Sequence, residues 1–171
     1  IGYRWTYEIE DPRERRLRGL GTSSAPDQPE IAATEWVDLD VTVSTSPDQI
    51  AIAPGALLRE WHQDGRRHFR YKTDEPIVNI FSTSARYAVK KETHDGIALE
   101  LYSHPGHGAN ADRILRASKN TLTHLSEAFG PYPHPHLRIV EVPAHWQFGG
   151  FATGGVIFLH EARGFMIDAR D

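Results

Sequence analysis

The chain has 171 residues, of which 39% are hydrophobic and 25% charged, a composition typical of one ordinary globular domain or two small ones. Its net charge of -4 lacks the basic surplus of a nucleic-acid-binding protein, and no window approaches the ~20 apolar residues of a membrane span. The absence of cysteine excludes disulfides and thiolate metal sites and leaves the cellular compartment open.

The first half of the chain has the pattern of short β-strands. Alternating apolar residues predict a half-buried strand over 36–44, and Asp64-Gly65 predicts a hairpin turn. Further strands are predicted at 3–10, 50–52, 57–62, 66–72, 77–81, 85–91 and, after the Asp95-Gly96 turn, 97–102. Short strands joined by turn residues indicate an antiparallel sandwich or sheet.

The pattern changes near residue 96. Asn110 is a good N-cap for a helix, which Gly130 and Pro131 should end. Its predicted buried stripe consists of Ala111, Leu115, Leu122, Leu125 and Phe129. Two strands follow at 137–142 and 155–159. We therefore predict an α+β protein with an antiparallel β-domain over 1–95 and a second domain over 96–171.

Loop histidines are the first candidates for chemistry: His104, His107, His134, His136 and His145. His-x-x-His or His-x-His in a proline-rich loop gives at most two ligands, whereas zinc needs three or four that converge in space. No carboxylate sits at a spacing that completes a known site. We therefore expect surface histidines and no metal site, with a small metal protein as the remaining alternative.

Two other kinds of catalytic site find little support. Glu161 and Asp168 could act as a carboxylate pair, but such pairs are recognised by distance in space, so the spacing alone is a weak signal. A G-x-S-x-G nucleophile elbow, a phosphate-binding loop and a dinucleotide fingerprint are all absent from the sequence.

The glycine-rich stretch 148–155 is the best candidate for binding. Four glycines let another chain approach the backbone closely, and beside an edge strand this suits an extended peptide held by main-chain hydrogen bonds. A flexible loop with tight turns explains the same glycines equally well.

The order of motifs resembles a known family. FGPYP (129–133), LRIVEVP (137–143) and the glycine-rich strand that ends at His160-Glu161 are similar to the opening of the catalytic domain in aminopeptidase-N-like zinc metallopeptidases. STSPDQIAIAPG (44–55), GRRHFRYKTDEPI (65–77) and SARYAV (84–89) resemble the extracytoplasmic peptidase domain fused to bacterial ABC-transporter permeases.

The resemblance implies a saddle-like β-domain followed by the first strands and long helix of a thermolysin-like domain. It also implies zinc on two His and one Glu, a metal-activated water and a glutamate base. The string nearest to the family's His-Glu-x-x-His is His160-Glu161-Ala162-Arg163-Gly164, with Gly in place of the second His. We therefore expect no cofactor in this chain and zinc in an intact parent.

The predicted substrate-binding residues are Gly149, Gly150, Phe151, Ala152 and Thr153, which match the family's Gly-x-Met-Glu-Asn strand. Ala152 stands where the family has the glutamate that anchors a substrate's α-ammonium group, and a methyl group cannot make that charge-assisted hydrogen bond. An exopeptidase with another anchor, an endopeptidase and a peptidase-like binding domain all stay open.

These observations predict an N-terminal fragment of a metallopeptidase-like protein, inactive alone, from the extracytoplasmic part of a bacterial membrane protein. Its expected partners are a peptide substrate and, through other parts of the parent, the membrane; nucleic acid is not expected. Uncovered apolar surface on 137–142 and 155–159 predicts self-association. The alternative is a non-catalytic interaction module of a transporter permease.

Overall fold

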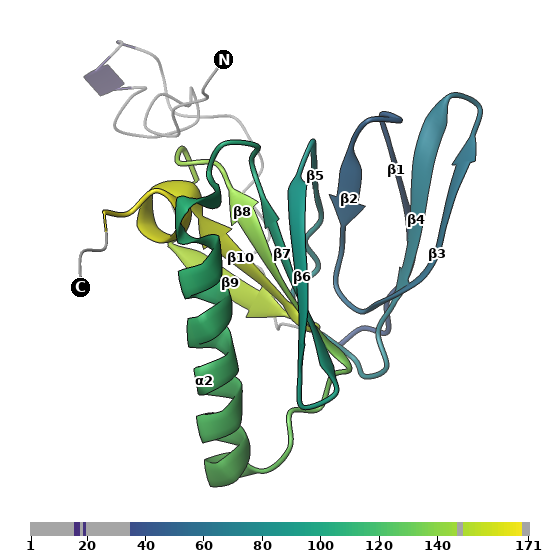
Figure 1. Ribbon diagram of the computed structural model, residues 1–171. Helices are drawn as coiled ribbons and strands as arrows, with labels where there is room; N and C mark the ends of the chain where they lie inside the picture. The colour runs from purple at the N-terminus through teal and green to yellow at the C-terminus, as the bar shows by residue number, and fades with distance from the viewer. Residues whose placement is uncertain (1–15, 18, 20–34, 147–148, 169–171) are drawn as a thin grey trace. The chain divides into compact units, whose positions relative to one another are not determined.

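The structure is a computed structural model that describes residues 16–17, 19, 35–146 and 149–168, and the strand predicted at 3–10 lies outside them. Residues 36–171 form one compact unit of mixed α+β architecture (Figure 1). Its ten strands are β1 (Asp40–Thr45), β2 (Ile50–Ile52), β3 (Ala56–Gln63), β4 (Arg66–Lys72), β5 (Thr83–Ala85), β6 (Ala88–His94), β7 (Ile97–Ser103), β8 (His136–Val142), β9 (Gly150–Thr153) and β10 (Val156–His160). Between β7 and β8 lie the 3₁₀ turn η2 (Gly108–Asn110) and the helix α2 (Ala111–Phe129), and the π-helical turn η3 (Glu161–Phe165) follows β10.

The largest sheet has five strands in the order β6-β7-β8-β10-β9. Its three central strands, β7, β8 and β10, are parallel, whereas the outer strands β6 and β9 run antiparallel to their neighbours. A three-stranded antiparallel sheet, β1-β4-β3, and the two-stranded β2-β5 pair complete the β-structure. Most strand pairs are therefore antiparallel, as predicted, and the parallel centre is the exception.

Both predicted Asp-Gly turns form. Asp64 and Gly65 have φ of 49° and 71° between β3 and β4, and Asp95 and Gly96 have 49° and 80° between β6 and β7. Positive φ at both central residues gives the twist that tight hairpins need, and Asp and Gly tolerate it.

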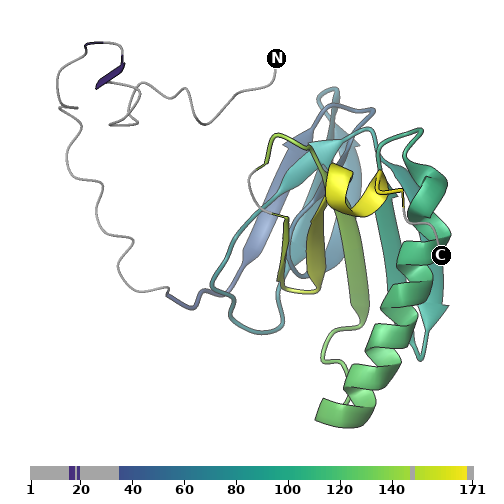
Figure 2. The same ribbon diagram turned by 90° about the vertical axis from the view of Figure 1, so that its left-hand side faces the viewer.

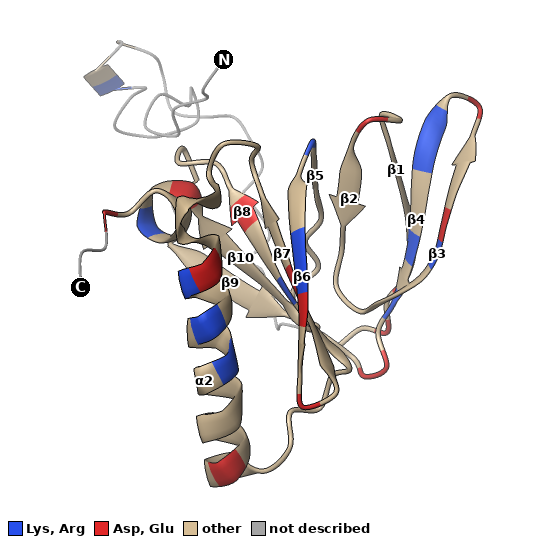
Figure 3. Cartoon of the chain, in the orientation of Figure 1, with Lys and Arg blue, Asp and Glu red and all other residues tan. Residues whose placement is uncertain are grey.

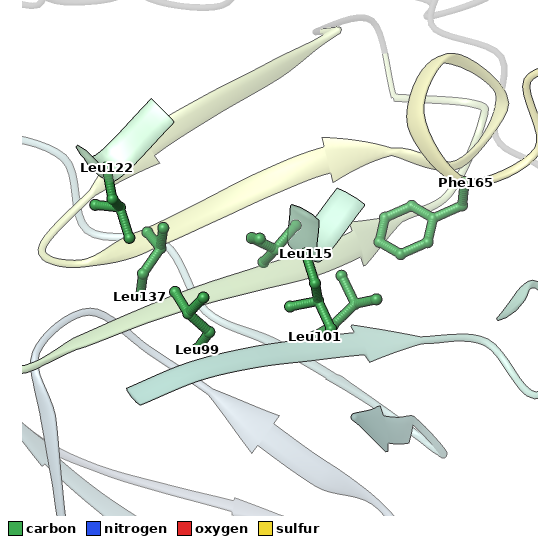
Figure 4. Close-up of a cluster of buried hydrophobic side chains, with 7 residues drawn as sticks. Leu99, Leu101, Leu115, Leu122, Leu137 and Phe165 are labelled. Carbon is green, nitrogen blue, oxygen red and sulfur yellow. The ribbon is translucent and has the colours of Figure 1, made fainter. Parts of the chain in front are cut away.

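α2 packs on one face of the five-stranded sheet, and the β1-β4-β3 sheet lies on the opposite side of it (Figures 1 and 2). Seven buried residues form the core between helix and sheet, six of them labelled in Figure 4: Leu99, Leu101, Leu115, Leu122, Leu137, Ile139 and Phe165. Burying one such side chain stabilises the fold by about 1.5–3 kcal/mol, so this cluster fixes α2 against β7 and β8.

Two further clusters lie on the other side of the sheet. Val140, Val142, Val156 and Phe158 meet Ile52 and Tyr102 there, and Phe69 and Tyr71 of β4 pack with Ala51 and Ala53. The buried Arg138 guanidinium connects the layers because its Nε donates to Glu100 at 2.9 Å and its NH1 donates to the Gly55 carbonyl at 2.6 Å.

One local prediction is wrong, and two hold only in part. Residues 77–81 form no strand: Ile77 makes one isolated bridge with Val37, and Ile80 is 57% exposed. Asn110 is the N-cap residue of α2, as predicted, but its side-chain amide donates to the carbonyls of Phe165 and Ile167 and makes no capping hydrogen bond. The helical stripe is buried only in part, because Leu125 and Phe129 are 46% and 85% exposed.

Gly130 ends α2 with φ of 98° and donates its N–H to Ser126, as expected of a residue just past a helix C-terminus. The predicted domain boundary at 95/96 falls in the turn between β6 and β7, two strands of one sheet. A division into domains over 1–95 and 96–171 stays a prediction.

Candidate functional site

The predicted substrate-binding residues lie on β9, at one edge of the five-stranded sheet. β9 pairs only with β10 among the described strands, with Phe151 opposite Phe158 and Ala152 opposite Ile157. Gly149 continues the ladder, since its carbonyl accepts the His160 N–H at 3.2 Å. In an antiparallel pair, backbone groups point alternately toward and away from the partner. The N–H and C=O groups of Gly150 and Ala152 therefore point to the outer edge.

Gly150 permits the close approach of β9 to β10. A Cβ at this position would lie 2.8 Å from the Phe158 carbonyl oxygen, a distance that side chains do not tolerate. The glycine is thus required by strand packing, which favours an ordered edge strand over the flexible loop that the sequence left open. Phe148 lies outside the described residues.

Charge distinguishes the two edges of this sheet. The opposite edge strand, β6, carries Lys90, Lys91 and Glu92, whereas β9 and β10 contain no Lys, Arg, Asp or Glu (Figure 3). Charged side chains, Lys above all, commonly prevent an edge strand from pairing with another chain. β9 lacks this protection.

The two faces of β9 differ. Phe151 stacks on Phe158 with ring centroids 4.9 Å apart and meets the Phe81 ring edge-on at 5.4 Å. Trp146 also packs edge-on against Phe81, at 4.5 Å. On the other face, Ala152 lines an apolar groove between α2 and the strands β8, β10 and β9, which we call the helix–sheet groove. Its volume is ≈ 830 Å³.

Thr153 and Gly154 hold the end of β9 to the rest of the unit. The Thr153 hydroxyl donates to the Asn79 carbonyl at 2.7 Å, and the Gly154 carbonyl accepts the Gly55 N–H at 2.9 Å. All five predicted residues thus belong to one ordered stretch of backbone.

His160 and Glu161, the part of the chain closest to the family's zinc motif, do not fit that zinc site. His160 is buried, its Nε2 donates to the Ala144 carbonyl at 2.8 Å, and its Nδ1 accepts the Ala162 N–H at 3.1 Å. Both ring nitrogens are therefore occupied. A Cβ at Gly164 would lie 2.4 Å from the Leu159 side chain, so a second His there would require that side chain to move.

The structure brings together residues that the sequence analysis kept apart. His107, Glu141 and Glu161 each offer a ligand atom, and these atoms lie within 4.8 Å of one another. The sequence does not single out Glu141, and it places Glu161 beside His160 in the motif-like string and with Asp168 in a possible carboxylate pair; neither His160 nor Asp168 is in this group. The sequence signal for Glu141 is a carboxylate inside the strand LRIVEV, whose other charged residue is Arg138.

His136 occupies the start of β8 beside Gly155. It is 7% exposed, and within the described part of the chain its Nε2 has no hydrogen-bond partner. Burial first, and then the positive charge of Arg138, lower the pKa of His136 to about 4, so the imidazole is neutral near pH 7. The ring of His134, another of the candidate loop histidines, lies near the His136 ring, with the two ring centroids 6.3 Å apart.

No family model matches the chain, and a search of curated proteins finds no similar sequence. Within its described residues, no helix is long and apolar enough to cross a membrane.

Proposed function

We propose that this chain supplies the β-scaffold and a substrate-facing edge strand of a zinc-metallopeptidase-like protein. In this proposal an extended peptide adds to the outer edge of β9 along Gly149–Thr153. The observation that carries it is the uncharged edge strand, with the backbone groups of Gly150 and Ala152 directed outward. Peptide main chain would hydrogen-bond to these groups, and side chains would alternate between the Phe151 face and the helix–sheet groove.

The wider assignment rests on the order of motifs. The β-rich first half, the long helix and the glycine-rich edge strand support a saddle-like domain followed by the start of a thermolysin-like domain. We further propose that the parent lies in the extracytoplasmic part of a bacterial membrane protein. Because His160 and Glu161 do not form the family's His-Glu-x-x-His zinc motif, we propose that the chain alone hydrolyses no peptide.

Ala152 favours the second candidate, a non-catalytic interaction module of a transporter permease. An alanine side chain offers a bound peptide no carboxylate for its amino terminus, so the edge strand would bind peptide backbone without selecting chain ends. Both candidates use the same strand and differ in whether the intact protein cleaves what it binds.

Peptide binding can be tested at Ala152. The 171-residue chain should bind an acetylated hexapeptide of alternating Val and Thr, measured by calorimetry and by amide shifts of β9. Ala152→Pro should abolish binding because proline has no N–H to donate, whereas Ala152→Ser should retain it. The same hexapeptide N-methylated at alternate residues should not bind.

Two outcomes would contradict the proposal. Equal binding of the methylated and unmethylated peptides would exclude strand addition, whatever Ala152→Pro does to the fold. Chelator-sensitive cleavage of peptides by the purified chain would show that it is a hydrolase in its own right.

A further inference from the structure

The carboxyl ends of three parallel strands meet at one end of the five-stranded sheet. β7 leads into the loop that carries His107, Glu141 is the penultimate residue of β8, and Glu161 directly follows β10. In sheets of parallel strands, ligands characteristically bind outside these carboxyl ends. Residues from positions 107, 141 and 161 thus reach one place because of the strand order β7-β8-β10.

Glu141 lies at the centre of this group. It is only 5% exposed, and its carboxylate accepts the His104 backbone N–H at 2.6 Å and lies 2.5 Å from His107 Nδ1. Moving a carboxylate out of water is costly unless charge and hydrogen bonds compensate. The position therefore favours a cationic partner beside Glu141.

Hydrogen bonds tie the three segments to one another, one of them through the Glu161 carboxylate itself and two through Asn110. Glu161 accepts the N–H of Ala144, which follows β8, at 3.0 Å. Asn110, beyond the His107 loop, donates to the carbonyls of Phe165 and Ile167 at 2.9 Å each, in the segment after Glu161. Such ties hold the imidazole and both carboxylates in place before any ligand arrives.

We propose that His107, Glu141 and Glu161 bind a divalent cation of the zinc class. One imidazole and two carboxylates are ligands that Zn²⁺ accepts, and three protein ligands leave a coordination position for water. With metal–ligand bonds of about 2.0–2.2 Å, ligand atoms lie about 3.4 Å apart. The cation therefore replaces the proton between His107 and Glu141, and their side chains separate by about 1 Å.

This site differs from the zinc site that the family resemblance implies, which would need residues that this chain does not contribute. It is also independent of peptide binding at β9. His107 and Glu161 are both partly exposed, so a cation can reach the buried carboxylate between them.

Metal binding by the full 171-residue chain tests the proposal. After treatment with a chelator, the protein is titrated with Zn²⁺ in competition with a chromophoric chelator of known affinity. We expect one Zn²⁺ per chain and a higher thermal midpoint with zinc. His107→Gln and Glu161→Gln should each weaken binding at least about tenfold. The controls His124→Gln and Glu127→Gln, on the exposed face of α2, should bind like the wild type.

Glu141→Gln should also abolish binding, but a buried substitution can unfold the protein. The variants of the two partly exposed ligands, His107→Gln and Glu161→Gln, therefore decide the test. Circular dichroism without metal checks that both variants are folded. If the wild type does not compete with the chelator, or if His107→Gln and Glu161→Gln bind zinc as tightly as the controls, the site does not exist. If the His124→Gln control lost as much zinc affinity as His107→Gln, the ion would bind to scattered surface imidazoles, and the proposed site would likewise be overturned.

Discussion

Gly55 joins the β-layers through its backbone. Its N–H donates to Gly154 beside the edge strand, and its carbonyl accepts the Arg138 guanidinium. φ at Gly55 is 90°, and a Cβ there would lie 2.2 Å from the Lys72 carbonyl oxygen. Two features of this position therefore exclude every residue but glycine: the positive φ and the lack of room for a Cβ atom.

Gly55→Ala should accordingly destabilise the protein more than Gly96→Ala. Gly96 has a similar φ of 80° but open space around it, so its substitution measures the conformational cost alone, about 1–2 kcal/mol. The clash at Gly55 should add about 1–3 kcal/mol. Urea unfolding of both variants gives the free energies, and equal values would contradict the close approach of Gly55 to the Lys72 backbone of β4.

His136 should make stability depend on pH. Its pKa is about 4 in the folded protein and about 6.5 when unfolded, so the unfolded chain binds the proton more tightly. The stabilisation is complete above pH 6.5 and declines as pH falls toward 4. Between pH 7 and 4.5 the wild type should lose about 2–3 kcal/mol more than His136→Gln.

The measurement is the free energy of unfolding in urea at both pH values. His124→Gln, which removes an exposed helical histidine, should keep the wild-type dependence on pH. If His136→Gln lost as much free energy of unfolding as the wild type between pH 7 and 4.5, the acid sensitivity would originate in other groups. The assignment of a buried, neutral imidazole to His136 would then be wrong.

At the scale of elements, predictions succeeded where a local signal decides the structure. Asp64-Gly65 and Asp95-Gly96 fix their hairpins because few residues adopt positive φ, and Gly130 ends α2 for the same reason. The segment 77–81 has an apolar pattern but no partner strand. Phe81 instead packs its ring against Trp146 and Phe158, a tertiary contact that no local pattern encodes.

The candidate sites depend on tertiary contacts in the same way. The glycines alone fitted an edge strand and a flexible loop equally well, because the sequence could not show that Gly150 is packed against the Phe158 carbonyl. The group of His107, Glu141 and Glu161 was not predictable, because it depends on the parallel order of β7, β8 and β10. Sequence spacing cannot reveal ligands supplied by three separate strand ends.

At the scale of the whole molecule, apolar surface is distributed unevenly. α2 covers its sheet through Leu115 and Leu122, while Leu125 and Phe129 at its C-terminal end stay exposed beside the helix–sheet groove. The adjoining strands β9 and β10 carry no charge. Exposed apolar surface that adjoins an uncharged edge strand is typical of an interface.

We therefore predict that the chain associates with a second copy of itself through this groove. Sedimentation equilibrium should show a mass that rises with concentration. Leu125→Ser with Phe129→Ser should shift association to at least about tenfold higher concentration, because both side chains lose apolar area that only a partner can bury. Leu58→Ser, at a 53% exposed position on β3, is the matched control and should associate like the wild type. A monomer at every concentration would mean that this face stays in water and that the groove binds no second copy.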